Sequence, residues 1–265
     1  SAAVVPVAQV SVTSSYTQCQ GTSINLMANV NGATSFTWNG PNSYTSRLPN
    51  PTLLNISPTS SGNYSVTAYF TSNQTTLVCN STAVSNVSVV PMNPVLVTQP
   101  MNVCQGANVI LTATTAANPT YNWFGPNNLN LQQQNLIFNN IQPFLSGNYV
   151  VNAVWSIGSV SCTTSNTTNI NVVPVNSINV VPNITICNGE GTNLTANANG
   201  AVSYTWTGPN GFNVTQPNTQ FQNLNPTWSG VYTITAAFTN GNLTCYNTNQ
   251  TNFHLLLAIF VIIIV

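Results

Sequence analysis

The stretch Ser203-Tyr204-Thr205-Trp206-Thr207-Gly208-Pro209-Asn210 decides the fold, because the chain contains it three times in recognisable form. The other copies begin at Ser35 and Thr120 and read Ser-Phe-Thr-Trp-Asn-Gly-Pro-Asn and Thr-Tyr-Asn-Trp-Phe-Gly-Pro-Asn. Each copy alternates an aromatic, a small polar residue and a Trp, and then breaks at Gly-Pro-Asn. This pattern is typical of a half-buried strand that ends in a tight turn. It predicts the central strand of a β-domain.

The landmarks around this stretch recur in the same order. A Cys precedes it, Ser-Gly-x-Tyr and a second Cys follow it, and the set repeats roughly every 84 residues. That spacing is too long for a solenoid unit and fits a row of small β-sandwiches. No apolar stripe of helical period occurs before the C-terminal segment, so we expect an all-β chain. The expected boundaries are 1–90, 91–173 and 174–255 for three domains and 256–265 for a short apolar tail.

The six cysteines fall as one pair in each repeat. Domains of this size bury a modest core, which a covalent bridge would compensate. Because the repeats are equivalent, we expect each pair to close within its own repeat, and an even number of cysteines tied to a repeat indicates an oxidising compartment. The expected disulfides are Cys19–Cys79, Cys104–Cys162 and Cys187–Cys245.

The charge content is very low, with Arg47 as the one basic and Glu190 as the one acidic side chain. Without a basic surface the chain is not expected to bind nucleic acid or anionic lipid electrostatically. Stability must come from apolar burial, backbone ladders and disulfides, and should respond little to pH or salt. A surface of Asn, Thr, Ser and Gln with no net charge favours association. An acidic exterior is one environment that would suit this composition.

No catalytic constellation can be assembled from these residues. Acid–base chemistry would have to use Glu190 and His254, and His254 lies beside the apolar tail. A chain without Asp offers no calcium loop, and the cysteines lack zinc spacing. We therefore expect no enzymatic activity, no metal and no cofactor, with Glu190 in a turn and Arg47 in a solvated loop.

The order Cys, Trp, Ser-Gly-x-Tyr resembles the immunoglobulin-like superfamily. Over residues 7–255 the chain is similar to the tandem Ig-like or PKD-like repeats of bacterial and archaeal cell-surface proteins. The second Cys of each repeat comes later than in antibody-type domains, which moves the disulfide toward one end of the sandwich. The resemblance implies extracellular adhesion or scaffolding without a specific ligand. It also implies a core Trp and a tyrosine corner in each repeat, at Trp38, Trp123 and Trp206 and at Tyr64, Tyr149 and Tyr232.

The last strand of the third repeat continues directly into an apolar tail. As a helix this tail would span about 15 Å, too short to cross a bilayer core. It could be the beginning of a membrane anchor, a donor strand or core helix packed inside a polymer, or an extra strand of its own domain. Its β-branched composition favours strand addition. The tail residues expected to act in assembly are Leu256, Leu257, Ile259, Phe260, Val261, Ile262, Ile263, Ile264 and Val265.

The N-terminus begins where a preceding repeat would end its last strand, since Val4-Val5-Pro6 matches Val-Val-Pro at the end of the first and second repeats. This match predicts a head-to-tail contact in which the tail of one copy packs against the first repeat of the next. The segment has neither a Met nor a basic region, so we expect any secretory signal to have been removed already.

Sequons for N-glycosylation are abundant, although a chain this rich in Asn, Ser and Thr would contain roughly ten by chance. They lie almost entirely in the first and third repeats, as expected if neighbouring subunits shielded the second. The sequon at Asn63 lies inside the Ser-Gly-x-Tyr corner, so we expect it to stay unmodified. The expected glycosylation sites are Asn55, Asn73, Asn80, Asn86, Asn166, Asn183, Asn193, Asn213, Asn242 and Asn249.

These observations favour a non-enzymatic building block of an extracellular assembly at the cell surface, either a pilus-like filament or a surface layer. Its partners would be copies of itself, N-linked glycans and, through the tail, a membrane. The alternative is a membrane-anchored adhesin or glycan-binding surface protein whose repeats hold a ligand site away from the cell.

Overall fold

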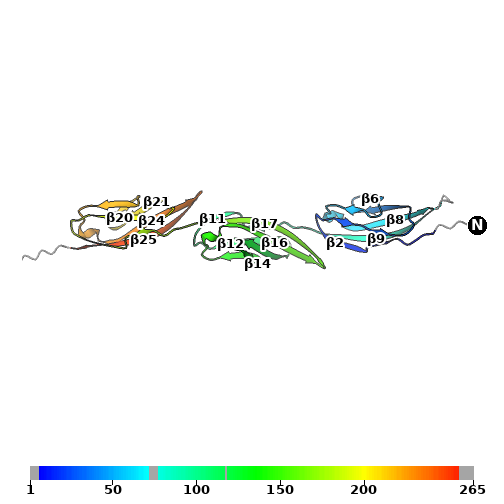
Figure 1. Cartoon of the computed structure of the whole chain (residues 1–265), viewed down its shortest axis with the longest axis horizontal. Helices are drawn as coiled ribbons and strands as arrows, with labels where there is room; N and C mark the ends of the chain where they lie inside the picture. Colours follow the sequence, from blue (N-terminus) through cyan, green and yellow to red (C-terminus); the bar gives the residue numbers. More distant parts are fainter. Residues whose placement is uncertain (1–5, 72–76, 117, 257–265) are drawn as a thin grey trace, which may run out of the picture.

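The structure of the protein, a computed structural model, describes residues 6–71, 77–116 and 118–256. The chain forms three β-sandwich domains in a row, with the N-terminus at one end of the row (Figure 1). Within the described residues the helical segments are short 3₁₀ turns, namely η1 (Pro58–Ser60), η2 (Pro143–Leu145), η3 (Pro209–Gly211) and η4 (Pro226–Trp228).

The strands divide among the three domains in chain order. Domain 1 contains β1 (Ser11–Val12), β2 (Ser15–Cys19), β3 (Ile24–Asn25), β4 (Ala28–Asn29), β5 (Ser35–Gly40), β6 (Tyr44–Ser46), β7 (Thr52–Leu53), β8 (Gly62–Thr71) and β9 (Val78–Val90). Domain 2 contains β10 (Leu96–Val97), β11 (Met101–Cys104), β12 (Val109–Thr114), β13 (Thr120–Gly125), β14 (Leu129–Leu131), β15 (Asn135–Phe138), β16 (Gly147–Ile157) and β17 (Val160–Val173). Domain 3 contains β18 (Asn179–Val180), β19 (Asn183–Cys187), β20 (Thr192–Asn197), β21 (Ser203–Thr207), β22 (Asn213–Val214), β23 (Asn218–Phe221), β24 (Gly230–Asn240) and β25 (Leu243–Leu256).

Each domain repeats one topology. The larger layer is a five-stranded sheet, ordered β2-β9-β8-β5-β6, β11-β17-β16-β13-β14 and β19-β25-β24-β21-β22. Its first strand runs parallel to the last strand of the domain, and the other pairings are antiparallel. The facing layer is β10-β12-β15 in domain 2, β18-β20-β23 in domain 3, and two short pairs, β1-β4 and β3-β7, in domain 1. This is a tandem Ig-like architecture, and it confirms the all-β prediction.

The repeated Trp strands β5, β13 and β21 lie inside the larger sheets, so alternate side chains face the opposite layer. Trp38, Trp123 and Trp206 are fully buried, each within the core cluster of its domain. Each indole Nε1–H donates to a backbone carbonyl further along the chain, at 3.2 Å to Pro49, 3.1 Å to Gln134 and 3.1 Å to Pro217. The largest core residue of each domain therefore buries its ring without leaving its polar group unpaired.

The Gly-Pro-Asn turn and the Ser-Gly-x-Tyr corner contact each other, which explains why the two motifs recur together. In domain 3 the Tyr232 hydroxyl donates to the carbonyl of Trp228 at 3.0 Å, and its ring lies against Gly208. A Cβ atom at Gly208 would come within 2.4 Å of that ring, so only glycine fits there. Asn210 Nδ2 donates to the carbonyl of Thr227 at 3.1 Å and fastens the turn to the same corner. The equivalent corners of domains 1 and 2, at Tyr64 and Tyr149, are built in the same way.

We predict that the stability of the protein is nearly independent of pH between about pH 4 and pH 9 and falls above about pH 10. Burial raises the pKa of Tyr149 and of Tyr232 to about 12. A phenol in the unfolded chain ionises near its ordinary value of about 10, so the folded state holds these protons more tightly. Their contribution is complete below about pH 10 and is lost as the pH rises toward 12. Below pH 9 little can change, because the chain has a single acidic side chain.

Thermal melts followed by circular dichroism over this pH range check the prediction. Tyr232→Phe removes the ionisable group and keeps the ring, so domain 3 of this variant should lose less stability at alkaline pH. A steep loss of stability between pH 7 and pH 4 would contradict the prediction.

Candidate functional site: the domain joints

The disulfides connect neighbouring domains. Cys19 of domain 1 is bonded to Cys162 of domain 2, and Cys104 of domain 2 to Cys245 of domain 3, with a Cα–Cα distance of 5.6 Å in both. The predicted pairing within each repeat was therefore wrong. The bonds Cys19–Cys79, Cys104–Cys162 and Cys187–Cys245 do not form.

The physical reason is that the two cysteines of one domain lie at opposite ends of its sandwich. In domain 2, Cys104 ends β11 and lies level with Val173, the last residue of the parallel strand β17. Cys162 lies near the beginning of the same strand, roughly 11 residues or about 35 Å away. A disulfide needs Cα atoms about 4.4–6.8 Å apart. A bond within the domain is therefore out of reach.

Long hairpins bring the cysteines of adjacent domains together. The hairpin β16–β17 turns at Gly158 and points back toward domain 1, and the hairpin β24–β25 points toward domain 2 in the same way (Figure 1). Cys162 and Cys245 lie near the turns of these hairpins, and both are almost fully buried. Each hairpin thus fastens its domain to the outgoing end of the domain before it.

The linker backbone is held at both joints. The side-chain carbonyl of Gln20 accepts the backbone N–H of Met92 at 3.2 Å, and that of Gln105 accepts the N–H of Val175 at 2.9 Å. The glutamine follows the disulfide cysteine directly in both cases. The two joints therefore share one design, in which the turn after the first Cys bonds to the outgoing chain.

A second set of hydrogen bonds holds each linker against the hairpin of the following domain. Asn166 Nδ2 donates to the carbonyl of Val95 at 2.6 Å, and Asn249 Nδ2 donates to that of Ile178 at 2.6 Å. With the disulfide, these bonds restrict rotation about the linker, so we expect the row of domains to behave as a stiff rod.

Apolar side chains fill the joints. Val90 and Val173 end the last strands of domains 1 and 2 and are only 6% and 2% exposed. Val173 packs into the core cluster of domain 3, and half-buried Cys104 contacts the same cluster. At the first joint Pro91 and Trp155 line a hollow of about 310 Å³. Each joint is thus a small apolar contact with a covalent bond beside it.

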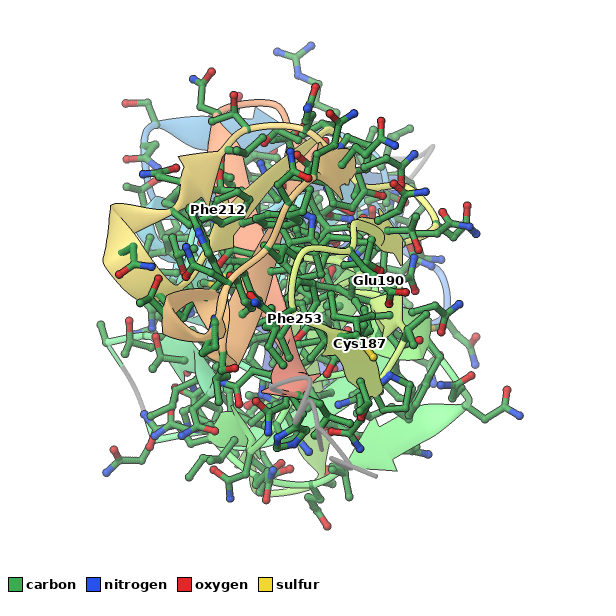
Figure 2. The ribbon with its side chains drawn as sticks, turned by 90° about the vertical axis from the view of Figure 1, so that its left-hand side faces the viewer. Cys187, Glu190, Phe212 and Phe253 are labelled. Atoms are coloured by element: carbon green, nitrogen blue, oxygen red, sulfur yellow. A yellow bond between two sulfur atoms is a disulfide. The ribbon has the colours of Figure 1, made fainter. Side chains whose placement is uncertain are left out.

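The two remaining cysteines lie at the two ends of the molecule. All six cysteines are among the described residues, and Cys79 and Cys187 are unpaired. Cys79 is half-buried near the free end of the hairpin β8–β9 in domain 1, whereas Cys187 is exposed at the end of β19. Figure 2 looks onto the end of domain 3, where Cys187 and Glu190 lie close together. The Glu190 carboxylate accepts the backbone N–H of Cys187 at 3.2 Å.

Both ends also expose apolar residues at positions that the internal joints bury. Leu256 is paired with Cys187 in the parallel strands, as Val90 is with Cys19 and Val173 with Cys104. Its side chain is 54% exposed. At the other end Leu77 is 53% exposed, whereas its counterparts Val160 and Leu243 are half-buried. The two ends therefore carry the two halves of a joint, each without its partner.

Several predicted site residues carry no structural information. Leu256 is the one predicted tail residue within the described ranges. The others lie outside them, namely Val4, Val5, Leu257, Ile259, Phe260, Val261, Ile262, Ile263, Ile264 and Val265, as does the sequon at Asn73. Arg47, Glu190 and His254 are exposed, Arg47 in domain 1 and the other two in domain 3.

Two further features concern the described residues alone. Within them no helix is long and apolar enough to cross a membrane. The same residues contain no group of three or more His, Cys, Asp or Glu side chains that could hold a metal ion.

The predicted glycosylation sites differ in accessibility. Asn166 and Asn249 point their amide nitrogens at the linker carbonyls described above. Asn86 donates to the side chain of Asn63 at 2.9 Å. The exposed sequon residues are Asn55, Asn63, Asn80, Asn86, Asn183, Asn193, Asn213, Asn242 and Asn249.

Surface hollows bear on the alternative of a ligand-binding protein. One of about 600 Å³ lies on domain 3 and is lined by Asn179, Thr195, Asn197, Tyr204 and others. The hydroxyl of Tyr204 is already bonded to the backbone of Ala198, at 2.9 Å to the N–H and 3.0 Å to the carbonyl. This hollow offers one half-buried aromatic ring and no charged group.

Comparisons with known proteins show a similarity of fold to tandem Ig-like domains. No family model and no curated protein matches the chain. Among solved structures, the I-band fragment I67–I69 of titin aligns with a TM-score of 0.56 and 12% identity, over 97% of this chain and all of the fragment. An E-to-A variant of the same titin domains gives the same values. Extracellular domains 3–5 of Drosophila OTK align with a TM-score of 0.43 and 13% identity, over 96% of this chain and all of theirs. The protein consists of three tandem Ig-like domains.

Proposed function

We propose that the protein is a structural subunit of an extracellular assembly, a pilus-like filament or a surface layer, in which copies of the chain join head to tail. The observation that supports this proposal is the similarity of the two outer ends of the molecule to the two sides of an internal joint. The C-terminal end of domain 3 has the cysteine and the apolar residue of the outgoing half of an internal joint, with Asn188 in place of the glutamine. The free end of domain 1 has the cysteine and the apolar residue of the incoming half, with Ala83 in place of the asparagine. We propose no catalytic activity and no cofactor for it.

An oxidising location outside the cytoplasm fits this role. Two disulfides between domains would not persist in a reducing cytosol. The surface has no net charge to keep copies apart, so apolar and backbone contacts can act between subunits with little electrostatic repulsion. An acidic medium would leave such a surface almost unchanged, which is consistent with life at a cell surface in acid.

Head-to-tail contact would extend the row of domains without limit. A contact between two different patches of one molecule propagates as a filament when its rotation does not close a ring. The internal joints already place successive domains in a line (Figure 1). A third joint of the same kind would continue that line from one subunit to the next.

Negative-stain electron microscopy of the purified protein tests the proposal. Filaments or lattices are expected for the whole chain. Deletion of residues 257–265 leaves the described domains intact, so it separates the role of the tail from that of the domain ends. Loss of assembly in the deletion would assign the joint to the tail, and filaments that persist would assign it to the domain ends. Monomeric rods from the whole chain at high concentration would overturn the proposal and favour a membrane-anchored adhesin.

We further propose that the assembly is N-glycosylated, and we predict that the sites are unequally occupied. Asn166 and Asn249 should stay unmodified, because their amide nitrogens face the backbone of the linker at 2.6 Å. Asn193 and Asn213 are exposed on β20 and β22 and should be accessible to the transferase. Glycopeptide mass spectrometry of protein from its native source, digested with chymotrypsin, checks this. High occupancy at Asn166 with a folded domain 2 would contradict the prediction.

A further inference from the structure

The two disulfides follow one rule, and applying the same rule to the next domain in the row would pair the two remaining cysteines. The first Cys of domain 1 bonds to the second Cys of domain 2, and the first Cys of domain 2 bonds to the second Cys of domain 3. The first Cys of domain 3, Cys187, and the second Cys of domain 1, Cys79, are left over. Cys187 ends β19 in domain 3, and Cys79 lies near the free end of the hairpin β8–β9 in domain 1. Domains 1 and 3 are the outer domains of the row (Figure 1), so these two cysteines cannot bond to each other within one chain.

The backbone around Cys187 matches that around the bonded cysteines. Cys19, Cys104 and Cys187 are each followed at the second position by a glycine with φ of +84°, +87° and +88°. In all three turns the glycine N–H donates to a backbone carbonyl at 2.7–2.8 Å, that of Ile56, Ile141 and Leu224 in turn. Cys187 is therefore held in the backbone geometry that Cys19 and Cys104 adopt.

The surroundings of Cys79 and Cys187 supply the second observation. Exposed Leu256 lies in register with Cys187, as buried Val90 and Val173 lie in register with Cys19 and Cys104. Exposed Leu77 lies two residues before Cys79, where the internal hairpins have half-buried Val160 and Leu243. Each free cysteine is thus accompanied by the apolar residue that a joint would cover.

We infer that Cys187 of one subunit forms a disulfide with Cys79 of the next, so that the polymer is covalently continuous through a third copy of the internal joint. This inference rests on the proposed head-to-tail assembly and names the residues that lock it. In the bond-forming step, the thiolate of one cysteine displaces a thiolate from a small-molecule or enzyme disulfide. The resulting mixed disulfide is then attacked by the other cysteine. One protein S–S bond forms, the oxidant disulfide is reduced to two thiols, and both cysteine protons pass to solvent or to those thiols.

Electrophoresis in hot SDS without reductant tests the bond. Oxidised assemblies should give a ladder of multimers that collapses to single chains when reductant is added. Cys187→Ser and Cys79→Ser should each abolish the ladder and give at most a dimer, whereas Thr207→Ser, an exposed change on β21 outside the proposed joint, should keep it. Mixing the two cysteine variants should produce a dimer through the one complementary pair, Cys187 of one and Cys79 of the other.

Cleavage with cyanogen bromide identifies the bond, because the methionines at 27, 92 and 101 separate the cysteines. Without reductant, Cys19–Cys162 keeps fragment 1–27 attached to fragment 102–265. Fragment 28–92 contains Cys79 as its only cysteine. It should therefore remain attached to fragment 102–265 only if Cys79 is bonded to Cys187.

The outcomes separate this inference from the proposed function. Filaments in the microscope that dissolve to single chains in SDS without reductant, with fragment 28–92 released, would overturn the disulfide and leave the assembly standing. A ladder made of Cys187–Cys187 and Cys79–Cys79 bonds would overturn the head-to-tail direction as well. Absence of any assembly, with or without oxidant, would overturn both.

Discussion

Replacing Trp206 with alanine is expected to destabilise domain 3 by about 3–5 kcal/mol and to leave domains 1 and 2 close to their original stability. The indole is fully buried against Leu194, Tyr232 and Phe253 within one core cluster, and its removal leaves a cavity that the two sheets cannot close. The carbonyl of Pro217 would also lose its hydrogen-bond donor. Because the three domains have separate core clusters, joined to the next domain only through joint residues such as Val173, the loss should stay largely local.

Hydrogen exchange read by mass spectrometry, peptide by peptide, resolves the three domains and checks this expectation. Val202→Ala is the matched control, since Val202 is exposed nearby and its change should cost less than about 0.5 kcal/mol. An equally small effect for Trp206→Ala would mean that the indole is not a core residue and would favour the alternative of a glycan-binding surface protein.

Replacing Cys104 with serine should lower the unfolding free energy of domain 3 by about 4 kcal/mol in the chain-entropy model. With domain 2 folded, the bond to Cys245 fixes both ends of a segment of roughly 70 residues, from the linker to the hairpin turn. Without the bond, the unfolded segment regains the entropy of a chain fixed at one end.

Urea unfolding followed by tryptophan fluorescence measures the effect, with Trp206 and Trp228 as the reporters in domain 3. Cys187→Ser is the matched control, because Cys187 has no partner within the chain and its replacement should leave the unfolding curve unchanged. Equal curves for the wild type and Cys104→Ser would contradict the prediction.

The fold could be predicted from the sequence because the recurring motifs correspond to packing contacts within each domain. The recurring Trp and Tyr must be buried, and each Gly of the Trp-x-Gly-Pro-Asn turn faces a Tyr ring at a distance that excludes any side chain. Such constraints are local, so they are visible as motifs.

The disulfide pairing depends on where strand ends lie in space, and equivalence of the repeats is satisfied equally by bonds within a repeat and by bonds between neighbours. A signal was nevertheless present. In the second repeat, roughly 11 strand residues separate Cys162 from Val173, the residue with which Cys104 is paired. An extended strand of that length holds the two cysteines about 35 Å apart. The role of the tail could not be predicted in the same way, because a short apolar run fits a strand, a helix and an anchor equally well.

The disulfides between neighbouring domains make the chain tolerant of proteolytic cleavage in its linkers. At each joint two covalent connections run side by side, the backbone linker and the bond Cys19–Cys162 or Cys104–Cys245. A protease that cuts the backbone between Val90 and Leu96, or between Val173 and Asn179, therefore leaves the domains attached to each other. The molecule comes apart at a joint only when both connections are broken.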